Sequence, residues 1–235
     1  GFILFREIFP EFRDRLRHLR DISPETLDLT SDQVLGCLLE IPKRIRYDEL
    51  EDWIGEEARF LKKKYRFNQH PVKMPIRKIL LYGIAECQRS NIFFDHLKSK
   101  RLTEAGRLMD VSHDGDRVVL HDPEYIQKPH ENEVSNEEMK DYISQGIDLA
   151  EIPGGYGCSI PEIDFIVDIL KEREDILGAQ LSGAGLGGCA MILARNLASD
   201  SLPQFITTRY LEKFGKPCEV LNLVPVNGCS IFGWD

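Results

Sequence analysis

The sequence predicts an α+β domain, in which helices come first and extended strands gather toward the carboxyl end. Apolar residues recur at helical spacing in three long stretches, residues 3–20, 76–99 and 160–174. Glycines cluster in residues 181–188, between two apolar runs. Two final segments, residues 217–226 and 228–234, have the composition of extended strands. Helices followed by strands around one sheet are typical of the α+β class.

The composition of the chain excludes some classes of binding partner. The chain has 235 residues, enough for one large or two small domains, and a net charge of −9. A nucleic-acid or anionic membrane surface requires excess Lys and Arg, so we expect no nucleic-acid and no membrane partner. No apolar run approaches the roughly 18 residues that cross a bilayer. The six cysteines form no C-x-x-C pair, which predicts reduced thiols, no metal site and a cytoplasmic location.

The first third of the chain is predicted to be helical. After the amphipathic stretch 3–20, Ser23 and Ser31 each stand at a cap-like helix start. Residues 46–67 are charged and helical in pattern, with lysines late in the run. Residues 62–75 are basic and read as a solvated connector.

The remaining elements follow in order. A long helix is predicted over 76–99 and a second over 102–113, followed by a polar connection through 136. A short helix is predicted at 137–150 and a glycine-rich loop at 152–159. An amphipathic helix with a proline near its start follows at 160–174, and a last helix at 201–214.

The stretch "LSGAGLGGCAMILAR", residues 181–195, contains G-x-G-x-x-G. A dinucleotide-binding fold would need an apolar strand before the glycines and a complete βαβ sheet. Gln180 and Ser182 interrupt that strand, and only 47 residues (235 − 188) follow Gly188. A second interpretation is structural, with glycines supplying positive φ at a tight hairpin.

A third interpretation comes from the neighbouring motifs, which occur in a fixed order along the chain. They are "LRDISPETL" at 19–27, "AECQRS" at 85–90, "LTEAGRLMDVSH" at 102–113, "SIPEID" at 159–164, the glycine stretch at 178–189 and "KPCEVLNLVPVNGCSIF" at 216–232. This series resembles the C-terminal part of the GHMP small-molecule kinases, and within them the galactokinase branch. The resemblance covers most of 78–235 and, loosely, 1–45, whereas residues 46–75 resemble an insertion.

The resemblance implies a fold and a domain division. Residues 76–235 would form the GHMP kinase C-terminal domain, a ferredoxin-like split βαβ arrangement with a four-stranded antiparallel sheet and flanking helices. Residues 1–75 would be a helical segment on its flank, with the insertion at about 46–75.

The resemblance also implies a reaction, the ATP-dependent phosphorylation of a monosaccharide at its anomeric hydroxyl. In this family the motif that the glycine stretch 178–189 resembles packs beside the phosphate loop and the substrate. The matching residues here, whose backbone N–H groups would face the site, are Ser182, Gly183, Ala184, Gly185, Gly187 and Gly188. Ser112 and His113 are secondary candidates for the wall of the site. At the position of Leu186 the family often has an aromatic residue or glycine, so this sequence departs from the family pattern there.

Several family motifs do not occur in this sequence. They are the phosphate loop Pro-x-x-x-Gly-Leu-Ser-Ser-Ser, the sugar motif Gly-Arg-Val-Asn-Leu-Ile-Gly-Glu-His and the catalytic Met-Asp-Gln. All belong to the family's N-terminal domain, so we expect no catalytic residue, no bound cofactor and no activity in this chain alone. The complete enzyme would use ATP and Mg²⁺, with the N-terminal domain on the same or a separate polypeptide. The alternatives are an inactive sugar-sensing or regulatory module and a subunit of a split kinase.

Other side chains suggest weaker hypotheses. Ser112 and His113 are adjacent on a helix and point about 100° apart, which argues against hydrolase chemistry. The sequence Asp114-Gly-Asp116 is predicted to be a turn rather than a cation loop. Four histidines in polar contexts are predicted to be exposed, namely His70, His96, His121 and His130.

Overall fold

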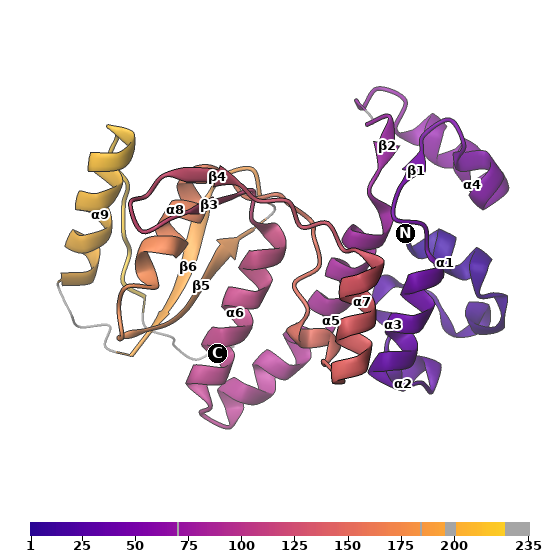
Figure 1. Ribbon diagram of the computed structural model, residues 1–235, viewed down its shortest axis with the longest axis horizontal. Helices are drawn as coiled ribbons and strands as arrows, with labels where there is room; N and C mark the ends of the chain where they lie inside the picture. Colours follow the sequence, from indigo (N-terminus) through magenta and orange to yellow (C-terminus); the bar gives the residue numbers. More distant parts are fainter. Residues whose placement is uncertain (70, 184, 196–200, 224–235) are drawn as a thin grey trace, which may run out of the picture.

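The computed structural model describes residues 1–69, 71–183, 185–195 and 201–223. Two groups of elements lie side by side, a helical group at the right of Figure 1 and a hairpin group at its left, and α6 is the member of the hairpin group nearest the helical group. The helical group comprises α1 (Phe2–Ile8), η1 (Pro10–Arg15), η2 (Leu19–Asp21), α2 (Pro24–Leu27), α3 (Ser31–Glu40), α4 (Leu50–Lys64), α5 (Ile76–Lys98), α7 (Asn136–Gln145) and η3 (Leu149–Glu151). The hairpin group comprises α6 (Leu102–Asp116), α8 (Pro161–Leu170), β5 (Ile176–Ser182), β6 (Cys189–Ala194) and α9 (Ser201–Phe214).

The chain also contains two short two-stranded ribbons. The first pairs β1 (Ile45–Arg46) with β2 (Lys73–Met74) and carries α4 between its strands. The second pairs β3 (Val119–His121) with β4 (Gln127–Pro129). Both are antiparallel, as is the β5–β6 pair.

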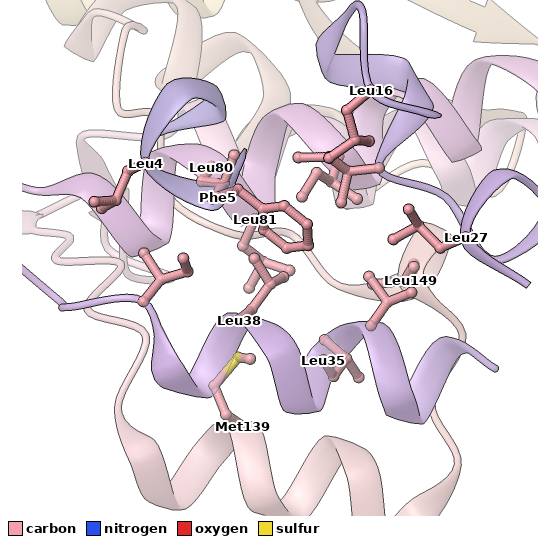
Figure 2. Close-up of a cluster of buried hydrophobic side chains, with 14 of the residues drawn as sticks. Leu4, Phe5, Leu16, Leu27, Leu35, Leu38, Leu80, Leu81, Met139 and Leu149 are labelled. Carbon is pink, nitrogen blue, oxygen red and sulfur yellow. The ribbon is translucent and has the colours of Figure 1, made fainter. Parts of the chain in front are cut away.

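The larger hydrophobic core joins the first part of the chain to later helices (Figure 2). Phe5 of α1, Leu38 of α3, Leu81 of α5 and Met139 of α7 are all fully buried in it. Residues before 75 therefore share one core with α5 and α7, while the predicted domain boundary at 75/76 stays a prediction.

Side-chain hydrogen bonds fix the ends of these helices. Thr30 and Ser135 form capping boxes that start α3 and α7. The buried Arg77 donates from Nε to the carbonyl of Ile41, at 2.7 Å, and from Nη2 to that of Leu39, at 2.8 Å. A guanidinium thus satisfies carbonyls that the end of α3 leaves without intrahelical partners.

Helix α6 passes strand β5 at backbone contact. A Cβ added to Gly106 would lie 2.0 Å from the carbonyl oxygen of Leu177, and one added to Gly178 would lie 1.9 Å from that of Gly106. Two glycines are required here because no side chain fits between the two backbones. On the other side of the hairpin, Val167 and Leu170 of α8 pack with Ile206 of α9 in a second core.

The secondary structure tests several sequence predictions. The helices expected at 76–99, 102–113, 160–174 and 201–214 are confirmed as α5, α6, α8 and α9. Within the described residues the sheets are two-stranded, and residues 217–223 form no strand. The expected four-stranded sheet is therefore not confirmed, and most of its predicted closing segments, 224–235, lie outside the described residues.

Two local predictions are wrong. Asp114–Asp116 is the last turn of α6 rather than a free turn, because the helix continues past the expected end. His96 is buried rather than exposed, and the ring of His121 is covered and lies 3.0 Å, from Nδ1, from Oδ2 of Asp168. His130 is partly buried, and His70 lies outside the described residues.

Candidate functional site

The glycine stretch is the turn of an antiparallel hairpin. Ser182 at the end of β5 pairs with Cys189 at the start of β6. Between them lies the hairpin tip, residues 183–188, in which Ala184 is outside the described residues. Positive φ angles occur at Gly183 (96°), Gly185 (85°), Leu186 (62°), Gly187 (118°) and Gly188 (99°). Because a strand and not a helix follows the glycines, the dinucleotide-binding interpretation is wrong.

The hairpin tip is seated on the 152–160 loop. The N–H of Leu186 donates to the carbonyl of Cys158 over 2.6 Å. A Cβ added to Gly185 would lie 2.5 Å from Sγ and 2.6 Å from the carbonyl oxygen of Cys158. Glycine is thus required at 185 both by its φ and by the close approach of the loop. Leu186 itself is 84% exposed, so its side chain points away from this contact.

The remaining donors of the hairpin tip are available. The N–H groups of Gly183, Gly187 and Gly188 make no hydrogen bond with a described residue. No atom of the described residues lies within 4 Å of a Cβ added to Gly183, and the nearest such atom to one on Gly188 is 3.8 Å away. Backbone N–H groups presented by such turns form concave binding sites for anions. The chemistry available at the tip is therefore the binding of an oxyanion.

The 152–160 loop is itself held by helix ends. The carbonyl of Gly115, in the last turn of α6, accepts the N–H groups of Tyr156, at 2.8 Å, and Gly157, at 3.1 Å. The carbonyl of Asp116 accepts the N–H of Ser159 at 2.9 Å. These bonds use carbonyls that a helix end leaves open, so the C-terminus of α6 positions the surface on which the hairpin tip rests.

A buried carboxylate joins this loop to α5. Oδ2 of Asp116 accepts the hydroxyl of Tyr82 at 2.8 Å, and its Oδ1 lies 3.1 Å from the Cys158 thiol. Burial raises the pKa of Asp116 above its ordinary value. Burial and the neighbouring Asp116 carboxylate raise the pKa of the Cys158 thiol to about 12. The thiol is therefore protonated and donates, rather than acting as a nucleophile.

The ring of Tyr156 lies over that of Tyr82. Their centroids are 5.3 Å apart with planes inclined by 17°. Tyr156 is nevertheless 48% exposed. The loop thus presents one open aromatic ring two residues before Cys158, on which the hairpin tip rests.

Ser112 and His113 lie behind the hairpin, on α6. His113 is wholly buried; its Nδ1 accepts the N–H of Leu181 at 3.2 Å, and its Nε2 lies 3.2 Å from Oδ1 of Asp164. An accepting Nδ1 requires the neutral ring with its proton on Nε2. The structure thus places His113 where it holds β5, and a role of Ser112 and His113 in the wall of the site stays a prediction.

Asp164 is the polar centre of this interior. Its Oδ2 accepts the N–H groups of Val118 and Val119, each at 2.9 Å. Burial raises the pKa of Asp164, but interactions with the side chains of His113 and Ser159 and with these two N–H groups outweigh it, so the pKa lies below its ordinary value. The carboxylate therefore stays charged and ties α6, α8 and β3 together.

Sequence reasoning missed Tyr82, Asp116, Cys158 and Asp164. The pattern "SIPEID" contained Asp164, but its burial depends on elements 46 residues apart in sequence. Among the positions described, no group of three or more His, Cys, Asp or Glu side chains could hold a metal ion. No described helix is long and apolar enough to span a membrane.

Comparison with known proteins finds a matching family. Residues 135–205 match the family described as GHMP kinases C terminal, a stretch that includes α7, α8, β5 and β6. A galactokinase of Thermosipho africanus (strain TCF52B) is 28% identical over 109 residues, which are 46% of this chain and 29% of that protein.

Shorter and closer matches occur in other galactokinases. One from Thermotoga neapolitana is 41% identical over 59 residues, 25% of this chain and 17% of the relative. One from Dictyostelium discoideum is 38% identical over 68 residues, 29% of this chain and 13% of the relative. The aligned part thus spans less than a third of each relative. Residues 135–205 thus match the C-terminal domain of the GHMP kinases, and the relatives that the chain resembles are galactokinases.

Proposed function

We propose that this chain forms one wall of the active site of a sugar kinase, opposite an N-terminal GHMP kinase domain on the same or a separate polypeptide. The reaction is transfer of the γ-phosphoryl group of ATP, with Mg²⁺, to a monosaccharide, at its anomeric hydroxyl. The observation that carries the proposal is the hairpin tip, whose N–H groups at Gly183, Gly187 and Gly188 lack partners among the described residues. Similarity to galactokinases supports the substrate class.

The chemistry suits such a wall. Phosphoryl transfer depends mainly on positioning and on neutralising the charge of the transferred group. Backbone N–H groups held in fixed directions supply both without a change of protonation. The hairpin tip is held by Cys158, Cys158 by Asp116, and Asp116 by Tyr82, so the donors of the tip are organised before substrate arrives. In this proposal the N-terminal domain supplies the ligands of Mg²⁺ and the group that activates the sugar hydroxyl.

The proposal includes the rest of the family architecture. In it β5 and β6 are two strands of a four-stranded antiparallel sheet, and the enzyme acts in the cytoplasm. Both statements rest on the family resemblance.

The test measures ADP release with a panel of neutral monosaccharides, for the chain alone and after its N-terminal GHMP kinase domain is supplied. We expect no turnover alone and sugar-dependent turnover together. Gly185→Ala should lower kcat of the assembled enzyme at least about tenfold, because a misplaced oxyanion donor costs that much or more. The matched control is Gly146→Ala, which also has positive φ (63°) but no atom within 4 Å of the added Cβ.

Three outcomes decide between the candidates. Turnover by the isolated chain would refute the proposal. An inert assembly whose melting temperature rises with a sugar and not with MgATP would support the sensing module instead. Equal losses of kcat in both glycine variants would show that backbone strain, and not the hairpin tip, controls activity.

A further inference from the structure

We propose that the open face of Tyr156 is the surface on which the monosaccharide ring stacks, an inference that rests on the proposed kinase function. The inference follows from how the ring is held, from its exposure and from the charges around it.

The ring is held in place before any ligand binds. One face lies on Tyr82, whose hydroxyl is in turn fixed by Asp116 at 2.8 Å. The backbone of Tyr156 is fixed by its N–H bond to the carbonyl of Gly115. Because both ends are fixed, stacking a ligand costs little further loss of side-chain freedom.

The neighbouring glycines leave the ring uncovered. A Cβ added to Gly154 would lie 2.6 Å from the backbone of Tyr82, and one added to Gly155 would lie 2.6 Å from the carbonyl of Asn132. These glycines let the loop lie close against α5 and the segment before α7. Gly157, on the other side, is exposed and carries no side chain that could shade the ring.

Nearby carboxylates favour a neutral ligand on this surface. The carboxylates of Glu86 and Asp116 lie close enough to Tyr82 to contribute, after burial, to the raised pKa of its hydroxyl. A neutral sugar on Tyr156 offers hydroxyl donors that these carboxylates do not oppose. The oxyanion would instead meet the N–H groups of the hairpin tip, which rests on Cys158, two residues from Tyr156.

A neutral ring on Tyr156 and a phosphate at the hairpin tip would therefore occupy adjoining positions. That is the arrangement in which a sugar hydroxyl can approach a transferred phosphoryl group. An aromatic wall with a few directed polar groups is the usual make-up of a small-molecule site.

The experiment compares Tyr156→Ala, Tyr156→Phe and the control Tyr65→Ala, a 42% exposed tyrosine at the end of α4. All are made in the chain assembled with its N-terminal domain. We expect Tyr156→Ala to raise KM for the sugar about fivefold or more, with KM for MgATP unchanged, since one aromatic contact contributes roughly that factor. Tyr156→Phe should behave as wild type, because it keeps the ring, and so should Tyr65→Ala.

The possible failures are distinguishable. A wild-type assembly that phosphorylates a sugar, with an unchanged sugar KM in Tyr156→Ala, overturns this inference and leaves the proposed function standing. A raised KM for MgATP alone also overturns it, because the ring would then hold the nucleotide. A wild-type assembly with no kinase activity refutes the proposed function, and the inference falls with it.

Discussion

The contact between α6 and β5 predicts that a helix substitution which ordinarily stabilises will here destabilise. An interior helical glycine replaced by alanine gains about 1 kcal/mol of helix propensity. In Gly106→Ala, however, the new Cβ would lie 2.0 Å from the carbonyl oxygen and 2.3 Å from the carbonyl carbon of Leu177. Since real Cβ contacts essentially never fall below 3.0 Å, helix and strand must separate by about 1 Å (3.0 − 2.0).

Forced shifts of this kind cost typically 1–3 kcal/mol, and a clash with backbone lies at the upper end, about 3 kcal/mol. After the gain in propensity, the free energy of unfolding should fall by about 2 kcal/mol. For a chain of this length, the melting temperature should fall by roughly 4–8 °C. Circular dichroism during thermal and urea unfolding measures both quantities.

Gly36→Ala is the matched control. Gly36 lies inside α3, and a Cβ added there meets nothing within 4 Å. This variant should gain up to about 1 kcal/mol. If Gly106→Ala were as stable as wild type, or gained as much as the control, the close crossing of α6 and β5 would be wrong.

Further predictions concern buried polar groups and a helix cap. Asp164→Asn should lower the free energy of unfolding by about 3 kcal/mol. Because the folded pKa of Asp164 lies below the unfolded value of about 3.9, the stability that its carboxylate contributes is present above that pH and is lost as pH falls through the folded pKa. Denaturant titrations at pH 3–7 should therefore show a smaller loss of stability in acid for the variant than for wild type, and equal slopes would contradict the assignment. Ser135→Ala should cost about 1 kcal/mol by removing the cap of α7, with no change expected in a Ser144→Ala control that lies near its end. Arg77→Met should cost about 2–3 kcal/mol in urea unfolding, since it leaves carbonyls at the end of α3 without donors; a neutral result would show that water replaces the guanidinium. Tyr82→Phe should cost about 1–2 kcal/mol by removing one donor to Asp116, and unchanged stability would remove that hydroxyl from the network.

The helices were predictable because each depends on local pattern. Helix α8 has Pro161 in its first turn and a continuous apolar face, and α9 spans the same residues, 201–214, as the prediction. The hairpin was predictable in its glycines, since positive φ at successive positions favours few other residues. The end of α6 was not, because Asp116 remains helical through contacts made by Tyr82 and Ser159, far away in the sequence.

The candidate site was likewise predictable in part. Its backbone donors follow from the glycine pattern, and the resemblance indicates what they would face. The groups that hold those donors could not be foreseen, because a tyrosine, an aspartate and a cysteine separated by 34 and 42 positions carry no periodic signal. Buried histidines show the same limit. His96 and His121 stand among polar neighbours in the sequence, yet packing with other elements covers them.

The way α6 lies along β5 also decides how this sheet can grow. The N–H of Ala179 donates to Oδ1 of Asp110 at 2.9 Å, and that of Leu181 to Nδ1 of His113, so side chains of a helix occupy donors that an incoming strand would need. A covered edge of this kind accepts no new strand. Any further strand, whether of this chain or of another, must therefore join beside β6, and the hairpin can extend in one direction only.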